Sequence, residues 1–278
     1  DMKKIRVINS DTDIKPWDVG VHASRTSFVA GNSLLGAIKK LKKKLSKKAA
    51  QLLKCTPDEL MYEDGQIKSS KSDVIDIGKV IRELHFTDPN ELSIATHFYE
   101  PNSQFQDKEF KGDISGSYAF AAQAIEVEVD TYTGNVKVLD VHVAQDVGKV
   151  LNPLGLEGQI EGGIVMGMGY AISEELIIEN GTVMNPNFHN YKLPTACDIP
   201  NIHFYPIETF DKEGPYGAKG VGEAPLIPTA AAIANAVCNA LDIEIDYLPI
   251  TPEKVLKALK EKKEGREPED KELKKVAS

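Results

Sequence analysis

One acid stands out in a glycine-rich stretch of the sequence, GPYGAKGVGEAPLIPTAAAIANAV, which covers residues 214–237. Glu223 is the only acid in that stretch, and it precedes an apolar segment with helical spacing. A lone carboxylate can act as a general base when it lies within hydrogen-bond reach of the proton it removes. It can equally stabilise the positive end of a helix dipole. This segment taken alone favours the second role.

Two further segments offer polar groups for binding. In GVHASRTS, residues 20–27, Ser24, Arg25 and Thr26 combine hydroxyls, a guanidinium and backbone N–H groups, which are the chemistry of a phosphate contact. The same residues could instead form a surface ion pair and cap a turn. In EGQIEGG, residues 157–163, Gln159 is either a solvent-exposed helix residue or a hydrogen-bonding partner for a ligand.

Common catalytic and nucleotide-binding motifs do not explain the chain. GMGYAI at residues 167–172 resembles part of a dinucleotide fingerprint, but helix-like sequence precedes it and no acidic strand end follows. GAKGVGE lacks the Gly-Lys-Ser/Thr of a phosphate-binding loop. The six histidines show no metal-binding spacing, and the sequence contains no nucleophile elbow.

Composition narrows the class of protein. The 278 residues are 41% hydrophobic and 27% charged, as in a soluble globular protein, and the formal net charge of -9 argues against a nucleic-acid partner. Lysine clusters at residues 39–48 and 254–275 are interpreted as solvated helix faces. Three widely spaced cysteines indicate neither a disulfide framework nor a cysteine zinc site, and they suit a reducing cytoplasm. The sequence shows no membrane-spanning apolar run and no apolar core of a secretion signal.

Hydrophobic periodicity predicts the elements that position these residues in the amino-terminal part. An alternating segment around Ile5 and Val7 predicts a strand, followed by a polar loop over residues 11–31. Asn32 or Ser33 is expected to cap a long helix. The apolar positions of that helix are Leu34, Ile38, Leu41, Leu45, Ala49 and Leu52.

The remaining elements are three hairpins and two helices. Turns at Asp64-Gly65, Gly134-Asn135 and Asn180-Gly181 each lie between alternating apolar segments. A glycine-rich helix is predicted between the second and third hairpins, where small residues would let a backbone or a ligand come close. An apolar helix is expected at about residues 229–241. Because strands and helices mix without strict alternation, the sequence predicts an α+β fold with mixed sheets and packed helices.

Five segments together carry a family resemblance. They are residues 11–32, 124–153, 157–176, 186–200 and 214–237. In this order they resemble the molybdenum-binding subunit of the xanthine dehydrogenase/aldehyde oxidase family of molybdenum hydroxylases. The resemblance covers only the carboxy-terminal half of that subunit. We therefore expect a subunit divided between two polypeptides, as in nicotinate dehydrogenase, with a fragment of a longer chain as the alternative.

The resemblance assigns roles to particular residues. Glu223 matches the family's glutamate that faces the molybdenum and acts as the base on a metal-bound hydroxyl. Gly220 and Gly222 would leave room for the cofactor, and Gln159 matches a glutamine that hydrogen-bonds it. The loop that wraps the pterin and its phosphate or dinucleotide is matched by His22, Ala23, Ser24, Arg25 and Thr26.

The same resemblance implies an organisation of the chain. Residues 1–120 would form the first part of the molybdopterin-binding region, with the pterin loop and the long helix. Residues 121–260 would form the second part, with the catalytic glutamate, and residues 261–278 a charged peripheral tail.

Cofactors and partners also follow from the resemblance. Molybdenum would be held by the pterin dithiolene rather than by protein side chains, and the pterin is expected as its cytosine dinucleotide. Electrons would leave through [2Fe-2S] and FAD subunits, and another polypeptide would supply the amino-terminal half. The expected reaction is hydroxylation of a carbon of an N-heterocycle, nicotinate-like or purine-like. An aldehyde-oxidising, carbon-monoxide-oxidising or reductive enzyme remains an alternative, as does a non-catalytic cofactor-assembly or interaction subunit.

Overall fold

The computed structural model describes residues 2–87 and 93–265. The chain divides into two compact units, Asp1–Gly116 and Ser117–Ser278. Both units combine helices with small sheets, so the predicted α+β fold class is confirmed. Among the described helices, none is both long and apolar enough to cross a lipid bilayer.

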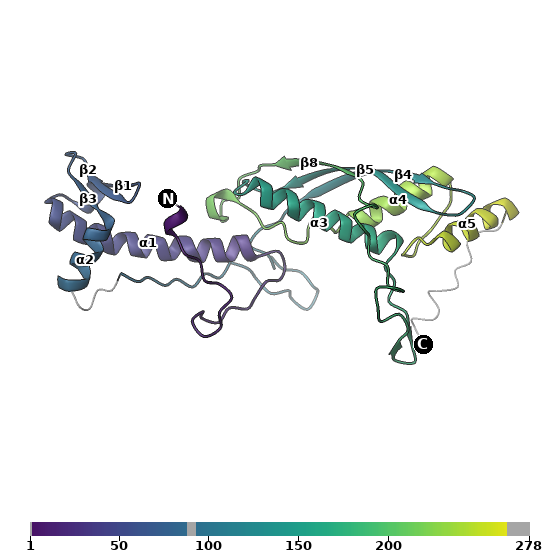
Figure 1. Ribbon diagram of the computed structural model, residues 1–278, viewed down its shortest axis with the longest axis horizontal. Coiled ribbons are helices and arrows are strands. Elements are labelled where there is room, and N and C mark those ends of the chain that lie inside the picture. The colour runs from purple at the N-terminus through teal and green to yellow at the C-terminus, as the bar shows by residue number, and fades with distance from the viewer. Residues whose placement is uncertain (1, 88–92, 266–278) are drawn as a thin grey trace. The chain divides into compact units, whose positions relative to one another are not determined.

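The first unit is built around one long helix, which meets a three-stranded antiparallel sheet and a shorter helix near its carboxy-terminal end (Figure 1). Its elements are η1 (Met2–Lys4), α1 (Thr26–Leu53), η2 (Pro57–Glu59), β1 (Leu60–Glu63), β2 (Gln66–Ser69), β3 (Val74–Asp76) and α2 (Ile77–Thr87). The core that joins them consists of Leu45, Ala49, Ile67, Ile75, Val80 and Leu84. The predicted hairpin is confirmed, because β1 and β2 are joined by Asp64 and Gly65, both with positive φ.

Helix α1 begins earlier than the sequence predicts. Its first residue is Thr26, about two turns before the expected caps. Phe28 in the first turn is only 5% exposed, and its ring packs against that of Tyr99 with centroids 6.2 Å apart. Ser33 lies inside the helix and its Oγ donates a hydrogen bond to the backbone oxygen of His97. Contacts with residues distant in sequence therefore extend the helix towards its amino terminus.

The strand predicted around Ile5 and Val7 is wrong. Residues 5–9 adopt no regular structure, and the side chains of Ile5 and Val7 are 69% and 76% exposed. A strand needs a neighbour to complete its backbone hydrogen bonds. Within the described ranges, no strand pairs with this segment.

The second unit consists of helices packed on one face of a three-stranded sheet (Figure 1). Its elements are β4 (Ala121–Val129), β5 (Val136–Asp146), α3 (Pro153–Ile172), β6 (Ile178–Glu179), β7 (Thr182–Val183), β8 (Asn201–Ile207), η3 (Pro215–Gly217), α4 (Thr229–Leu241) and α5 (Pro252–Glu264). The strand order is β4-β5-β8, with β4 and β5 antiparallel and β5 and β8 parallel. Side chains of all three strands and of α3, α4 and α5 share one core, which includes Val141, Val143, Ile160, Ile164, Ile233, Val237 and Val255.

The hairpin predicted over residues 125–145 is confirmed, with one added feature. Val138 and Val141 are both buried although they are three positions apart along β5, a spacing that would place them on opposite faces of a regular strand. The pairing with β4 shifts by one residue there, so that Leu139 has no residue opposite it. This bulge brings both valines to the core face of the sheet.

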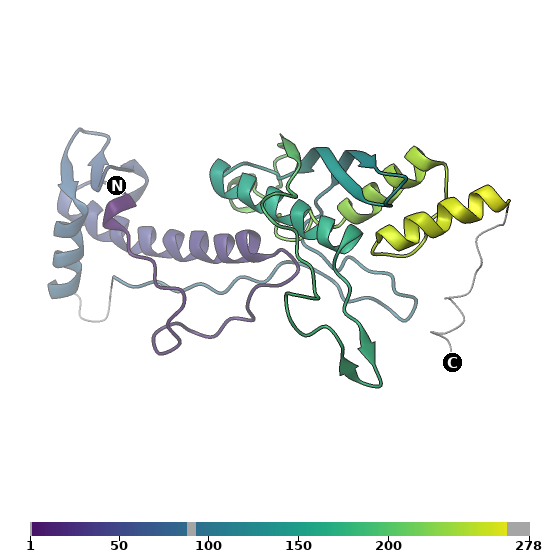
Figure 2. The ribbon, with the colours of Figure 1, turned by 45° about the vertical axis from the view of Figure 1, so that its right-hand side comes forward.

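Helix α3 is the predicted glycine-rich helix. The Asn152 side chain caps it by accepting a hydrogen bond from the backbone nitrogen of Gly155 at 3.1 Å, and Pro153 occupies the first turn. Beyond its carboxy-terminal end, the β6–β7 hairpin stands at the tip of a long extension (Figure 2). Asn180 and Gly181 form its turn, as predicted.

Helix α4 has the expected bounds, and α5 agrees with the interpretation of the lysines from residue 254 onwards as a helix face, whereas β8 was not predicted. The alternating residues Ile202 and Phe204 of β8 pack against the core, and this pattern was present in the sequence. Helix α5 is capped by Thr251, whose Oγ1 accepts a hydrogen bond from the backbone nitrogen of Lys254. Of the charged tail expected over residues 261–278, residues 266–278 lie outside the described part of the chain.

Candidate functional site

Glu223 lies in a loop that α3 holds in place from one side. The side-chain Nε2 of Gln159 on α3 donates a hydrogen bond to the backbone oxygen of Gly222 at 2.9 Å. Glu223 and Gln159 are both exposed. The structure therefore brings together three of the residues that the sequence singled out, Gln159, Gly222 and Glu223.

The loop is also held just after Glu223. The backbone oxygen of Pro225 accepts hydrogen bonds from Gln123 Nε2 on β4 at 2.8 Å and from Thr229 Oγ1 at 3.0 Å. Thr229 Oγ1 also lies 2.9 Å from Gln123 Oε1. The backbone nitrogen of Leu226 donates to the backbone oxygen of Glu223 at 3.1 Å, which closes a turn. Bonds on both sides of Glu223 therefore fix the backbone that carries it.

Glycines of α3 allow this loop to lie directly on the helix. A Cβ added at Gly163 would come within 2.8 Å of the Pro225 Cβ, and one added at Gly167 within 2.6 Å of the Thr229 Cβ. Both glycines are buried. A side chain at either position would push the loop away from α3, so these glycines set how closely the Glu223 loop approaches the helix.

Glu223 does not lie in the first turn of α4. The helix begins at Thr229, six residues later, and residues 224–228 form a separate turn. Its first turn contains no acidic residue. Because the helix dipole acts mainly on charges within the first turn, stabilisation of α4 does not explain the carboxylate at this position.

The residues from His22 to Thr26 form one turn at the start of α1. Ala23 and Ser24 have positive φ values of 49° and 54°, and the backbone nitrogen of Arg25 donates to the backbone oxygen of His22 at 3.2 Å. Arg25 occupies the cap position of α1, and its side chain makes no cap hydrogen bond there. The turn therefore presents the amino-terminal end of a 28-residue helix, where backbone N–H groups favour anions.

Arg25 also has an acidic neighbour. Its Nη2 lies 3.8 Å from Glu100 Oε1, and the Arg25 side chain is 23% exposed. The surface ion pair considered from the sequence therefore exists, at a distance longer than a strong charge-assisted hydrogen bond. His22 to Thr26 belong to the first unit, whereas Gln159, Gly220, Gly222 and Glu223 belong to the second.

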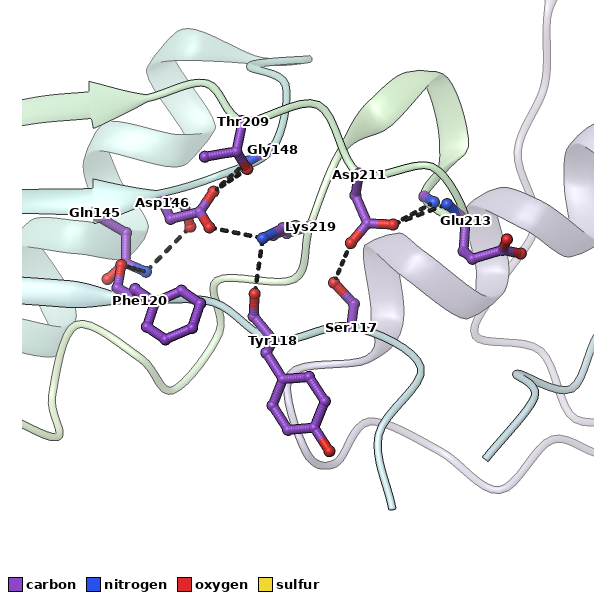
Figure 3. Close-up of polar contacts among 11 residues, drawn as sticks. Ser117, Tyr118, Phe120, Gln145, Asp146, Gly148, Thr209, Asp211, Glu213 and Lys219 are labelled. Carbon is purple, nitrogen blue, oxygen red and sulfur yellow. Dashed lines mark hydrogen bonds and ion pairs between the residues drawn. The ribbon is translucent and has the colours of Figure 1, made fainter. Parts of the chain in front are cut away.

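Sequence reasoning missed three polar residues around the Glu223 loop, Gln123, Asp146 and Thr229, and assigned Lys219 no catalytic role. Gln123 is half-buried and shares the inward face of β4 with Ile125 and Val127, so a polar residue in an apolar series was the available signal. Asp146 ends β5 in a buried position and pairs with Lys219 (Figure 3). Local patterns gave no sign of that pair, because its members are 73 residues apart.

The comparison with protein families decides the family. A model described as "Molybdopterin cofactor-binding domain" matches residues 1–200 of the chain. The chain belongs to this family. Membership confirms the resemblance to molybdopterin-binding subunits of molybdenum hydroxylases.

Individual members of the family are similar over most of the chain. The xanthine dehydrogenase molybdenum-binding subunit of Escherichia coli O157:H7 is 36% identical over 259 residues, which cover 90% of this chain and 33% of that protein. Subunit gamma of the 6-hydroxypseudooxynicotine dehydrogenase complex of Paenarthrobacter nicotinovorans is 30% identical over 262 residues, covering 91% and 32%. The chain therefore spans about a third of the length of these curated relatives.

A solved structure shows the same fold. The crystal structure of quinoline 2-oxidoreductase from Pseudomonas putida 86 matches with a TM-score of 0.77 and 26% identity, covering 90% of this chain and 32% of that one. The fold of most of this chain is thus shared with about a third of a longer protein.

Proposed function

We propose that this chain provides the molybdopterin-binding part of a multi-subunit molybdenum hydroxylase, with Glu223 as its catalytic base. The observation that carries the proposal is the exposed Glu223 on a backbone fixed by hydrogen bonds on both sides. A base must lie within hydrogen-bond reach of its proton, and a fixed backbone limits where its carboxylate can lie. Stabilisation of the α4 dipole does not explain an acid at this position, which supports a chemical role for Glu223.

The surface beside Gln159 has room for a cofactor. Gly158 and Gly162 flank Gln159 on α3, and a Cβ added at either glycine would meet no atom within 4 Å. A large polar group could therefore lie against the α3 backbone at this point. The side chain of Gln159 offers an amide for hydrogen bonds, and Gly220 and Gly222 add no side chain at two positions of the Glu223 loop. These residues fit a pterin cofactor.

The turn from His22 to Thr26 fits the anionic part of such a cofactor. Hydroxyls of Ser24 and Thr26, the Arg25 guanidinium and the amino-terminal end of α1 favour a phosphate or pyrophosphate. We propose that the pterin is a dinucleotide and that residues 1–120 contribute this turn, while residues 121–260 contribute Glu223 and the tail at residues 261–278 is peripheral.

The chain's own groups then have distinct tasks. When bound, the cofactor supplies a metal that accepts two electrons and an oxygen that derives from water. Gln159 hydrogen-bonds the cofactor through its amide and holds the Gly222 carbonyl. A carboxylate oxygen of Glu223 takes up the proton that leaves the oxygen nucleophile. Gln123 and Thr229 keep the backbone of Glu223 in place while the proton moves.

The substrate and partners extend the proposal. Quinoline 2-oxidoreductase and 6-hydroxypseudooxynicotine dehydrogenase are named for nitrogen-containing compounds, which supports an N-heterocycle as the substrate. Relatives named as subunits support a multi-subunit assembly. We propose [2Fe-2S] and FAD subunits as electron acceptors, further polypeptide sequence for the rest of the molybdenum site, and the cytoplasm as the location.

Replacement of Glu223 tests the base. In the assembled enzyme purified with its cofactor, Glu223→Gln is expected to lower kcat by about 100- to 10,000-fold, the contribution typical of general acid–base catalysis. Molybdenum and pterin contents should equal those of the wild type. Glu244→Gln, at an exposed acid of the same unit, is the matched control and should retain the wild-type rate.

The assay is reduction of an electron-acceptor dye with a panel of N-heterocycles, aldehydes and carbon monoxide. A wild-type rate in Glu223→Gln would refute the base. Turnover of aldehydes or carbon monoxide in place of heterocycles would change the substrate class. An assembly that contains neither molybdenum nor pterin would favour the non-catalytic interaction subunit.

A further inference from the structure

A buried ion pair lies at the amino-terminal end of the loop that carries Glu223. Asp146 is the last residue of β5, and Lys219 lies four residues before Glu223. Lys219 Nζ lies 2.6 Å from Asp146 Oδ2, and the two side chains are only 11% and 7% exposed (Figure 3). Eight other ion pairs of the described residues each have at least one partner that is more than a fifth exposed.

The polar groups of the pair are satisfied by bonds to several segments. Asp146 Oδ1 accepts hydrogen bonds from Thr209 Oγ1 at 2.8 Å and from the backbone nitrogen of Gly148 at 3.0 Å. Lys219 Nζ donates a second hydrogen bond, to the backbone oxygen of Tyr118 at 2.7 Å (Figure 3). The pair therefore joins the end of β5, the segment after β8, the segment before β4 and the Glu223 loop.

The backbone of Lys219 is fixed at the same point. Its nitrogen donates to the backbone oxygen of Val147 at 3.0 Å. A Cβ added at Gly148 would come within 2.3 Å of the Gly217 oxygen and 2.9 Å of Lys219 Cγ, so the two chain segments are in close contact. Lys219 is thus held by its side chain and by its main chain.

The negative charge of the buried Asp146 carboxylate is stabilised by hydrogen bonds. Burial acts to raise the pKa of Asp146, but hydrogen bonds from Lys219, Thr209 and Gly148 outweigh it and hold the pKa below its ordinary value. The carboxylate is therefore ionised at neutral pH. A buried ion pair is weak evidence for added stability, and its best-attested benefit is to select one conformation.

We propose that Lys219 and Asp146 are positioning residues for Glu223, an inference that rests on the function proposed above. Lys219 and Glu223 are four positions apart in the sequence, a span of at most about 14 Å even when fully extended. The loop is held at Lys219 and Gly222 before Glu223 and at Pro225 after it, so the pair sets where the loop begins. A misplacement of about 1 Å in a reacting group can cost about 100-fold in rate.

The test uses the assembled, cofactor-loaded enzyme with three variants: Lys219→Met, Lys219→Arg and the double variant Lys219→Met/Asp146→Asn. Lys219→Met leaves a buried charge unpaired and is expected to lower Tm, because breaking such a pair is strongly destabilising. The double variant removes both charges and should recover most of that Tm. Its kcat should nevertheless stay at least about 10-fold below the wild-type value, with KM unchanged, because the loop has lost its tether.

Lys219→Arg keeps a positive charge beside Asp146, so this variant remains informative if the other two fold poorly. The guanidinium is larger than an ammonium group and its donors lie in one plane, so it does not reproduce the position from which Lys219 Nζ meets both Asp146 Oδ2 and the Tyr118 carbonyl, and kcat should again fall about 10-fold with KM unchanged. Asp242→Asn is the control, since Asp242 pairs with Lys262 at 2.9 Å in the same unit but its side chain is 95% exposed. It should retain the wild-type kcat.

A second readout does not depend on turnover. Hydrogen exchange of peptides covering residues 217–226 should be at least about 10-fold faster in the double variant than in the wild type. Wild-type kcat in both the double variant and Lys219→Arg would overturn the proposal, as would unchanged exchange in this peptide. If Glu223→Gln kept full activity as well as the Lys219 variants, both the proposed function and the positioning role would fail. If Glu223→Gln lost activity while the Lys219 variants kept it, only the positioning role would fail.

Discussion

Gly162 and Gly163 are neighbours on α3 that differ in what a methyl group would meet. A Cβ added at Gly162 would have no atom within 4 Å, whereas one at Gly163 would lie 2.8 Å from Pro225 Cβ and 3.3 Å from the Leu226 nitrogen. Substitution of both glycines by alanine, one at a time, therefore isolates the packing of the Glu223 loop on α3.

Two opposing effects determine how each alanine substitution changes the free energy of unfolding. Alanine replaces glycine inside a helix with a gain of about 0.5–1 kcal/mol, and both variants share this gain. Only Gly163→Ala also forces the loop to move, and overpacking costs about 1–3 kcal/mol. The difference between the two variants in the free energy of unfolding should therefore be about 1–3 kcal/mol. For a unit of this size, it corresponds to a gap in Tm of about 2–12 °C.

Differential scanning calorimetry of the two variants and the wild type measures this gap. Gly162→Ala should unfold at or above the wild-type Tm, and Gly163→Ala should unfold well below Gly162→Ala. Equal Tm values for the two variants would show that the loop does not lie on α3 as described, and the reasoning about the Glu223 backbone would fail with it.

Two further predictions concern the polar groups around the loop. Gln123→Ala removes the hydrogen bond to the Pro225 oxygen and leaves Thr229 with one acceptor fewer. Urea denaturation should therefore show a loss of about 1–3 kcal/mol in the free energy of unfolding. An unchanged denaturation midpoint would contradict the hydrogen bonds described between Gln123, Pro225 and Thr229. The pKa of Asp146 is lowered in the folded chain, so the unfolded chain takes up a proton at this carboxylate at a higher pH than the folded chain does. The stability that the carboxylate contributes is therefore present above about pH 4 and is lost as the pH falls further. Acidification from about pH 5 to pH 3 should therefore destabilise the wild type more steeply than Asp146→Asn, and parallel pH profiles would count against the pair.

Local sequence signals predicted the local parts of this fold. Turns at Asp64-Gly65 and Asn180-Gly181 were predictable because the positive φ values found there favour these residue types. Helix α4 was predictable because its apolar spacing and its ends both lie within one short segment. The glycine-rich helix was predictable for the same reason, and the sequence indicated that its small residues allow a close approach.

Features that depend on residues far apart in sequence were missed. The start of α1 depends on Phe28 meeting Tyr99, and a strand near Ile5 would have needed a partner. The pair of Asp146 and Lys219 has no local signature, because a buried ion pair is defined by where the fold brings its members. The sequence identified Glu223 and Gln159 individually, whereas the bond from Gln159 to the Glu223 loop is visible only in three dimensions.

The close fit of α3 to the Glu223 loop limits how this region can change. If the helix slid by one residue along its axis, either Ile164 and Met168 or Gly162 and Met166 would lie opposite Pro225 and Thr229. Each direction therefore places at least one large side chain where only a glycine fits. The helix and the loop are therefore restricted to a single alignment. Anyone wishing to re-aim the carboxylate by protein engineering would have to redesign α3, about 60 residues earlier in the chain, together with the loop itself.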